Sequence, residues 1–536
     1  MSILPQVTEN TITFIKNTPA SHAWDKIGIK HHYGVCFPLS SIRSENSCGI
    51  GEFHDLIPMI EWCRKIGFDI LQLLPLNDTG TDTSPYNGIS GFALNPIFLS
   101  LTTLPDIHKV SDYKKKIQSM QALTTTSSVR YGIVGNKKLQ FLKEYYECIK
   151  SNILRDEGFN TFKETQNYWL VPYVLFRAIK ETIHWSPMEE WPEHLKNPDN
   201  ISSLSENLKP LTEFHAYIQY LCFQQLNYIK RFALDNGIFI KGDIPILISK
   251  DSCETWYFKD FFIKENSAGS PPDAYNKHGQ DWQFPLYNWE ALKKCHYVWW
   301  KKRVEYAENF YSVYRLDHIA GFFRIWALNN SGPNPSAGKF IPENKKEWLA
   351  QGNDILKAIL DSSDMLPIGE DLGIVPQCIK EAIKKFGICG TVIPRWERKW
   401  DGDGSFILPA NYSPLSMTSL STHDSDTLLL WWNHSPEEAK LYAKNNHFAY
   451  TRSLSPETQK LIIKNNFLSS SLFHINIIND YLSLRPDLIS KDPSKERINR
   501  PGTVSSSNWV YRTIPYVEEL LKHKSFNDEL SALLPS

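Results

Sequence analysis

Three short apolar runs in this 536-residue chain each end in acidic residues, and this repeated arrangement limits the possible folds more than any other feature. The first acidic residue follows Val313-Tyr-Arg-Leu316, and the second follows Leu366-Pro-Ile-Gly369. Charged groups at the carboxyl ends of parallel barrel strands face the site where the βα loops converge. The sequence therefore predicts catalytic residues at the mouth of a parallel barrel, namely Asp317, Glu370 and Asp424.

Buried strand-like runs alternate with helical patterns along the chain. Apolar residues at three- and four-residue spacing predict a helix over Phe53–Ile66, which Gly67 ends. This alternation predicts an α/β fold, a (β/α)8 TIM barrel. About eight strands are expected, at Gly34–Leu39, Phe68–Pro75, Gly237–Ser249, from Val313, from Leu366, at Gly390–Arg395, from Ser419 onward and at Trp509–Arg512.

The whole chain, residues 1–536, is expected to form one catalytic barrel domain interrupted by mostly helical inserted subdomains. Residues 77–235 are expected to be an inserted loop and helical subdomain between the second and third strands, because the segment is too long for a plain connection. Residues 250–290 are rich in Pro, Gly and aromatic residues. They are interpreted as a loop insertion that covers the substrate.

The amino-acid composition limits the classes of molecule that the protein is expected to bind. A formal net charge of -1 and a pI near 7.0 give no broad attraction to nucleic acid or to an anionic membrane. Aromatic residues make up 13 % of the chain, and their flat faces suit sugar rings as well as a large core. Nine scattered cysteines, no secretory leader and no membrane-spanning run predict a cytoplasmic protein with reduced thiols.

The three acidic residues have complementary chemistry for a glycosidic bond, which needs a proton donor and a carboxylate at the anomeric carbon. Arg315, on the same strand face as Asp317, would keep that carboxylate ionised and nucleophilic. Glu370, shielded from water, would have a raised pKa and donate a proton. Asp424, with His423, would bind sugar hydroxyls and favour the distorted ring.

Each of these features also has a structural explanation when taken alone. An Arg-x-Asp sequence is more often a structural ion pair, and a Glu-Asp pair before glycine can cap a helix. Asp, Glu and His at barrel strand ends also build two-metal hydrolase sites. Only their joint occurrence, in barrel order, favours a glycoside-cleaving site.

From Gly34 to about Arg512 the chain closely resembles the amylomaltase family, the 4-α-glucanotransferases of the α-amylase clan. The motifs that carry this resemblance are Ser84-Pro-Tyr86, Phe92-Ala-Leu-Asn-Pro96, Gly242-Asp-Ile-Pro-Ile246, Pro271-Pro-Asp273, Gly279-Gln-Asp-Trp282, Arg315-Leu-Asp-His318, Glu370-Asp-Leu-Gly373, Thr422-His-Asp424 and Arg497-Ile-Asn-Arg-Pro-Gly502. Two segments depart from the family pattern. Ile319-Ala-Gly321 stands where many members have Phe-Arg-Gly, and Ile393–Arg398 stands in place of an apolar run, which bears on acceptor preference.

The resemblance implies that Asp317 is the nucleophile, Glu370 the acid/base and Asp424 the stabiliser of the transition state. It also implies an interrupted barrel without a C-terminal β-domain, and neither cofactor nor metal. The substrate-binding residues that it implies are Arg315, His423, Asp243, Tyr86, Trp282, Gln280 and His318.

The leading hypothesis is therefore a 4-α-glucanotransferase that moves α-1,4-glucan segments between maltodextrins, glycogen or starch, with glucose as a small partner, through a covalent glucosyl intermediate. A retaining α-glucan hydrolase with the same carboxylates is the main alternative. A non-catalytic glucan-binding protein and a metal-dependent hydrolase are further alternatives. The sequence does not indicate the preferred donor and acceptor lengths or the oligomeric state.

Overall fold

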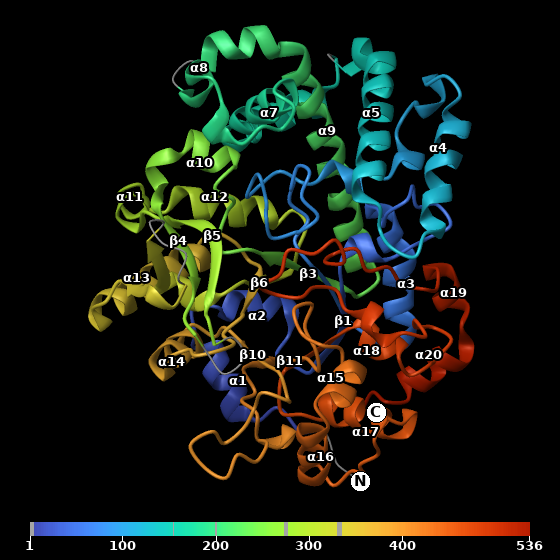
Figure 1. The fold of residues 1–536 in the computed structure, drawn as a ribbon, viewed down its shortest axis with the longest axis vertical. Helices are drawn as coiled ribbons and strands as arrows, with labels where there is room; N and C mark the ends of the chain where they lie inside the picture. Colours follow the sequence, from blue (N-terminus) through green and yellow to red (C-terminus); the bar gives the residue numbers. More distant parts are fainter. Residues whose placement is uncertain (1–4, 154, 199–200, 273–276, 330–334, 536) are drawn as a thin grey trace.

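The computed structural model describes residues 5–153, 155–198, 201–272, 277–329 and 335–535, and a closed parallel barrel lies at its centre (Figure 1). The barrel strands are β1 His32–Phe37, β2 Ile70–Leu73, β3 Phe239–Ile244, β6 Val313–Leu316, β9 Leu366–Gly369, β10 Gly390–Val392, β11 Ser416–Thr418 and β12 Phe473–Ile477. They are hydrogen-bonded in the order β10-β11-β12-β1-β2-β3-β6-β9. The Gly369 amide donates to the Cys389 carbonyl at 2.8 Å and closes the ring. The predicted barrel is confirmed.

Helices cover the outside of the barrel because each buries an apolar face against the strands. In α3 the side chains of Met59, Ile60 and Cys63 are fully buried, and Gly67, with a φ of +95°, ends the helix as expected. The helices associated with the barrel and its carboxyl-terminal part are α1 Glu9–Lys16, α2 Ser21–Ile27, α3 Leu56–Ile66, α11 Trp289–Lys294, α12 Val298–Ala307, α13 Lys345–Leu360, α14 Gln377–Lys385, α15 Leu428–His434, α16 Pro436–Asn445, α17 Pro456–Phe467, α18 Ile478–Leu482, α19 Val517–Lys522 and α20 Lys524–Ser531.

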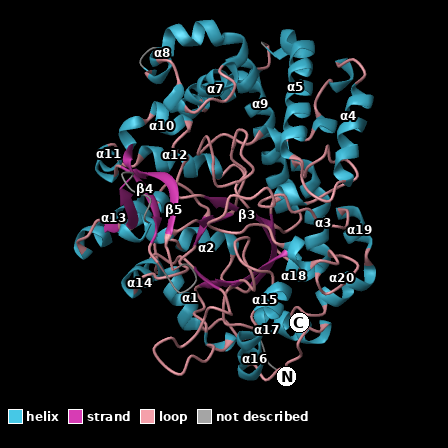
Figure 2. Ribbon diagram, in the orientation of Figure 1, coloured by secondary structure: helices cyan, strands magenta, loops and turns pink. Residues whose placement is uncertain are grey.

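A layer of helices lies between β2 and β3 in the sequence and above the barrel in Figure 2, where the strands form a magenta ring. It consists of α4 Tyr113–Gln121, α5 Tyr131–Ile153, α6 Glu157–Thr165, α7 Asn167–Thr182, α8 Glu193–Lys196 and α9 Ile201–Asp235. A buried ion pair, Arg177 Nη1 to Asp78 Oδ2 at 2.7 Å, joins α7 to the loop that follows β2. Tyr173 donates to the same carboxylate at 2.7 Å. This layer therefore fixes the start of that loop.

A second sheet, antiparallel and four-stranded, flanks the barrel in the order β5-β4-β7-β8. Its strands are β4 Phe262–Ser270, β5 Gln280–Tyr287, β7 Ile325–Asn329 and β8 Lys339–Ile341, and the short helix α10 Cys253–Tyr257 precedes β4 in the sequence. The interpretation of residues 250–290 as a loop was therefore wrong, since β4 and β5 lie within them. Their Pro, Gly and Ser residues gave turn signals but no clear alternation of apolar and polar residues.

The last two barrel strands also differ from the prediction. The seventh strand is Ser416–Thr418 rather than a run from Ser419, and the eighth is Phe473–Ile477 rather than Trp509–Arg512. Two buried polar side chains, His474 and Asn476, broke the apolar pattern of the true eighth strand. They are tolerated because Asn476 donates to Tyr481 Oη at 3.0 Å and to Asn466 Oδ1 at 3.2 Å.

In the described ranges, no helix is both long and apolar enough to cross a membrane.

Candidate active site

Arg315 lies at the centre of a cluster of carboxylates at the carboxyl end of β6. Its register partner in β3 is Asp243, so the two side chains project from the same face of adjacent parallel strands. Arg315 Nη1 lies 3.0 Å from Asp243 Oδ1, and Nη2 lies 2.8 Å from Asp317 Oδ1 and 3.7 Å from Glu370 Oε2. One guanidinium therefore holds three acidic side chains from three neighbouring strand ends.

Glu370 follows β9 and is largely shielded, with 15 % of its side chain exposed. Its two oxygens accept backbone N–H groups, Oε2 from His318 and Oε1 from Leu372, each at 2.9 Å. Burial raises the pKa of Glu370 to about 7, since lost hydration and the charge of Asp317 outweigh Arg315 and these hydrogen bonds. The group can therefore hold and release a proton near neutral pH.

Asp243 is fully buried in this cluster, where its carboxylate has two hydrogen-bond partners. Tyr86 donates its hydroxyl to Asp243 Oδ2 at 2.7 Å, and Arg315 Nη1 donates to the same oxygen at 3.1 Å. Burial raises the pKa of Asp243 although Arg315 opposes the shift. The contact joins the loop after β2, which carries Tyr86, to the end of β3.

A stack of aromatic rings leads from Tyr86 to the third acidic residue. The Tyr86 ring lies against His423 with a centroid separation of 5.1 Å, and Trp509 lies 5.7 Å from Tyr86 and 5.8 Å from His423. His423 Nε2 is 3.3 Å from Asp424 Oδ2. Tyr86 thus connects the Arg315 cluster with the Asp424 loop.

Asp424 differs from the other two acidic residues because 46 % of its side chain is exposed, against 23 % for Asp317. Asn499 Nδ2 donates to its Oδ1 at 2.7 Å. Partial desolvation works against ionisation, but His423, Asn499 and the charge of Arg315 prevail and lower the pKa of Asp424 to about 2. Asp424 therefore presents a permanent negative charge to the open side of the barrel mouth.

The structure brings all three acidic residues predicted from the sequence to one place. Asp317 and Glu370 share Arg315. The pKa of Tyr86 is raised mainly by burial and by the charge of Asp243, and the charges of both Asp317 and Asp424 raise it further. A carboxylate beside a carboxyl group that can hold a proton, at the open end of a barrel, can serve as nucleophile and acid in glycoside cleavage.

Three further predicted residues line the β5 side of the cluster. The Trp282 ring meets the His318 ring edge-on at 5.1 Å, and Trp282 Nε1 donates to Gln280 Oε1 at 3.1 Å. His318 has a φ of +40°, and this left-handed backbone directs its N–H to Glu370. Burial lowers the pKa of His318. Trp282 therefore approaches Glu370 through one intervening residue, His318.

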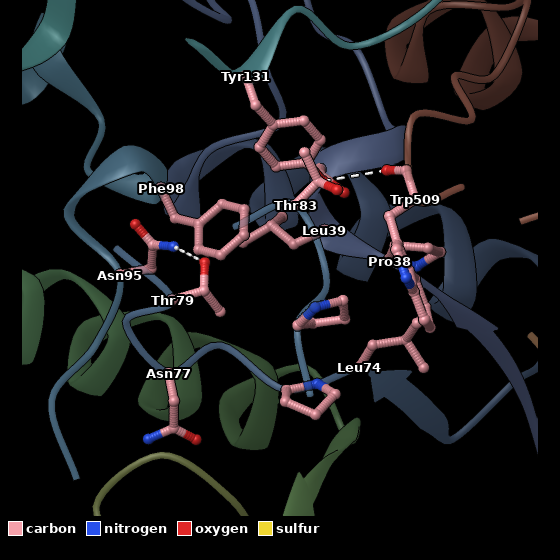
Figure 3. Close-up of a pocket in the computed structure, with 13 residues that line it drawn as sticks. Pro38, Leu39, Leu74, Asn77, Thr79, Thr83, Asn95, Phe98, Tyr131 and Trp509 are labelled. Atoms are coloured by element: carbon pink, nitrogen blue, oxygen red, sulfur yellow. Dashed lines mark hydrogen bonds between the residues drawn. The ribbon is translucent and has the colours of Figure 1, made fainter. Parts of the chain in front are cut away.

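A pocket beside this cluster opens between the ends of β1 and β2 (Figure 3). Tyr131 and Phe98 line one side of it, and Tyr131 donates to the Trp509 carbonyl at 3.1 Å. Next to Phe98, Asn95 donates to Thr79 Oγ1 at 3.2 Å. Because Trp509 also belongs to the stack with Tyr86, the pocket adjoins the carboxylate cluster.

The list of candidate site residues derived from the sequence missed Asn499, Arg497 and Trp509. Arg497 Nη2 donates to the Asp424 carbonyl at 3.3 Å, and the Asn499 N–H donates to the His423 carbonyl at 3.1 Å. The motif from Arg497 to Gly502 was the signal that could have found the first two. The motif residue Asp273 lies outside the described residues.

The described residues contain no group of three or more His, Cys, Asp or Glu side chains placed to hold a metal ion. The charge that faces Asp243, Asp317 and Glu370 is the guanidinium of Arg315, which is itself only 12 % exposed. Its pKa is well above the usual range because the attraction of these carboxylates outweighs burial. The cation is therefore permanent.

A closed (β/α)8 barrel with paired carboxylates at its strand ends defines the class of barrel enzymes that act on glycosidic bonds. The family model described as 4-alpha-glucanotransferase matches residues 37–516. The chain belongs to this 4-alpha-glucanotransferase family.

Curated relatives and solved structures agree with the family match. A 4-alpha-glucanotransferase of Chlamydia pneumoniae is 52 % identical over 98 % of this chain and 99 % of its own length, and one of Chlamydia caviae is 52 % identical over 96 % and 97 %. An amylomaltase from Streptococcus agalactiae, solved in complex with acarbose, has the same fold, with a TM-score of 0.80 and 24 % identity over 94 % of this chain and 98 % of that chain. The protein is thus an enzyme, and transfer is favoured over hydrolysis.

Proposed function

We propose that the enzyme transfers α-1,4-glucan segments by a retaining double displacement in which Asp317 is the nucleophile. The Asp317 carboxylate attacks the anomeric carbon, Glu370 protonates the leaving glycosidic oxygen, and a covalent glucosyl ester forms. Glu370 then takes a proton from the 4-hydroxyl of the acceptor glucan, which displaces Asp317. Two inversions give net retention.

The single observation that carries this proposal is the shared Arg315 guanidinium. Arg315 Nη2 lies 2.8 Å from Asp317 Oδ1 and 3.7 Å from Glu370 Oε2, and burial raises the pKa of Glu370 to about 7. The shared guanidinium thus places one carboxylate next to a carboxyl group that can hold a proton near neutral pH.

The lowered pKa of Asp424 supports its role beside the transition state. As positive charge develops on the reacting ring, a fixed carboxylate stabilises it, and the adjoining His423 contributes a hydrogen-bonding group. Arg315, Asp243 and Tyr86 lie on the same side and are proposed to bind the reacting glucosyl ring.

Transfer requires that an acceptor sugar compete with water for the intermediate. We assign Trp282 and Gln280 on β5, with His318, to acceptor contact, because Trp282 approaches the cluster at His318. Residues 250–290 would then cover the substrate. Aromatic contact that holds an acceptor and excludes water raises the effective concentration of the acceptor.

Maltodextrin, glycogen, starch and glucose are the proposed donors and acceptors. The nine free cysteines support a cytoplasmic location.

Incubation with maltotriose tests the proposal. Glucose and a ladder of longer maltodextrins are expected at a constant number of reducing ends. Hydrolysis would instead raise the number of reducing ends steadily. Asp317→Ala should abolish the ladder, and product formation that survives this substitution would refute the assigned nucleophile.

A further inference from the structure

Arg395 lies in the segment Ile393–Arg398, which departs from the family pattern in sequence. It follows β10 and is 5 % exposed. Its guanidinium packs near two indole rings, 5.7 Å from the centroid of Trp431 and 5.8 Å from that of Trp396. A buried cation is costly, so its hydrogen bonds matter to the fold around it.

The Arg395 hydrogen bonds go to the loop that carries Asp424. Arg395 Nη2 donates to Ser425 Oγ at 2.5 Å and to the Asp426 carbonyl at 2.6 Å. Ser425 Oγ also accepts the Thr422 N–H at 2.9 Å. Arg395 therefore binds both the side chain that closes this turn and the backbone just after Asp424.

The same loop is also held by a different part of the chain. Arg497 pairs with the Asp426 carboxylate and donates to the Asp424 carbonyl, while Asn499 donates to the Asp424 carboxylate at 2.7 Å. His434 Nδ1 lies 3.1 Å from Asp426 Oδ2. The loop that carries Asp424 is thus held both by Arg395 and by the 497–499 segment.

We propose that Arg395 is a positioning residue for the transfer reaction, which holds the turn from Thr422 to Asp426 so that Asp424 faces the reacting ring. The inference rests on the proposed role of Asp424. Arg395 donates to Ser425 and to the Asp426 carbonyl, which flank Asp424 in this turn, so its effect on Asp424 passes through the loop. A half-exposed carboxylate on a loop has no strand to fix it and depends on such contacts.

Arg395→Gln should lower kcat about 10- to 100-fold with little change in KM, since a charge-assisted hydrogen bond contributes about 1.5–3 kcal/mol. Arg395→Lys should restore part of the rate because it retains the charge. The acidic limb of the pH profile should move towards neutral pH in Arg395→Gln, because a displaced Asp424 loses contact with His423 and Asn499. A purely structural role would not move that limb.

Arg398→Gln is the matched control from the same segment. Arg398 donates to the Gly404 carbonyl at 2.9 Å, pairs with Glu438 at 3.5 Å, and stacks on Trp400 at 4.9 Å. The kcat of this variant should stay within about twofold of the wild type. If Arg395→Gln and Arg398→Gln lose activity equally, or if Arg395→Gln retains full kcat and an unshifted pH profile, the positioning role is wrong.

Asp424→Asn separates this inference from the proposed function. If that variant is active while Arg395→Gln is impaired, the assigned role of Asp424 fails. If Asp424→Asn is inactive while Arg395→Gln is normal, only the inference about Arg395 fails. Thermal unfolding of each variant identifies any loss that comes from misfolding.

Discussion

The two sides of the barrel mouth hold their acidic residues by different means. Asp317 and Glu370 directly follow β6 and β9, whose adjacent backbones are hydrogen-bonded in register. Asp424 lies six positions beyond the end of β11, and its carboxylate is bound by Asn499, 75 residues further along the chain. The first side is fixed by the sheet, and the second by contacts between loops.

This difference has a chemical counterpart. The strand-end side is shielded and contains the group whose pKa is raised to about 7, whereas the loop side is half-exposed and contains the group whose pKa is lowered to about 2. The proposed function therefore assigns the chemistry that forms and breaks bonds to the strand-end side. Electrostatic stabilisation is assigned to the side that several loops assemble.

The strand-end side should show the largest loss on mutation. Asp317→Asn removes the proposed nucleophile and should lower kcat about 10⁵-fold, as for other covalent catalysts. Measurement of maltotriose disproportionation over long incubations checks this value. Because Asp317 lies 23 % exposed beside Arg315, the variant should fold normally. A loss smaller than that of Asp424→Asn would reverse the comparison.

Glu370→Gln should lower the rate about 10³-fold with a poor leaving group, the scale of general acid catalysis, and less with an activated glucosyl donor. In the wild type the activity should fall as the pH rises through about 7, because the acid loses its proton. This alkaline limb should disappear in Glu370→Gln with the activated donor. Persistence of the limb would assign it to another group.

The raised pKa of Glu370 also predicts that the stability of the protein changes with pH. The folded-state pKa of Glu370 is raised, so the folded protein binds the proton more tightly than the unfolded chain does. Stability from this group is present below an unfolded pKa of about 4.3 and is lost as the pH rises through about 7. Glu370→Gln should therefore gain in unfolding temperature relative to the wild type between pH 5 and pH 8. A constant difference would contradict the shift.

The contrast also explains how much the sequence could reveal. Asp317 and Glu370 were predicted because a buried run followed by an acidic residue is a local pattern, and the strand positions it. Trp509 approaches the site through long-range contacts, which no local pattern encodes, and Arg497 could have been found only through the motif in which it stands. The strand at Phe473–Ile477 was missed for a related reason, since its buried polar side chains find partners only in the folded core.

On the loop side, Asn499→Ala removes the hydrogen bond to the Asp424 carboxylate. The expected loss in kcat is about 10-fold, since one hydrogen bond to a charged group contributes about 1.5–3 kcal/mol and the other contacts of the loop remain. The pKa of Asp424 should rise towards its ordinary value, which moves the acidic limb of the pH profile upward. Steady-state kinetics from pH 3 to pH 7 measure both effects. An unchanged acidic limb would show that Asn499 does not act through this carboxylate.

The smallest expected effect concerns Tyr86, which connects the two sides. Tyr86→Phe removes the hydroxyl that donates to Asp243 at 2.7 Å but keeps the ring that stacks on His423. Asp243 retains Arg315, so the predicted loss is about fivefold, equivalent to about 1 kcal/mol. Tyr86→Ala also removes the ring contact and should lose more, with an added rise in KM. Equal losses in the two variants would mean that the hydroxyl alone connects the two sides, and that ring stacking does not help to place the Asp424 loop.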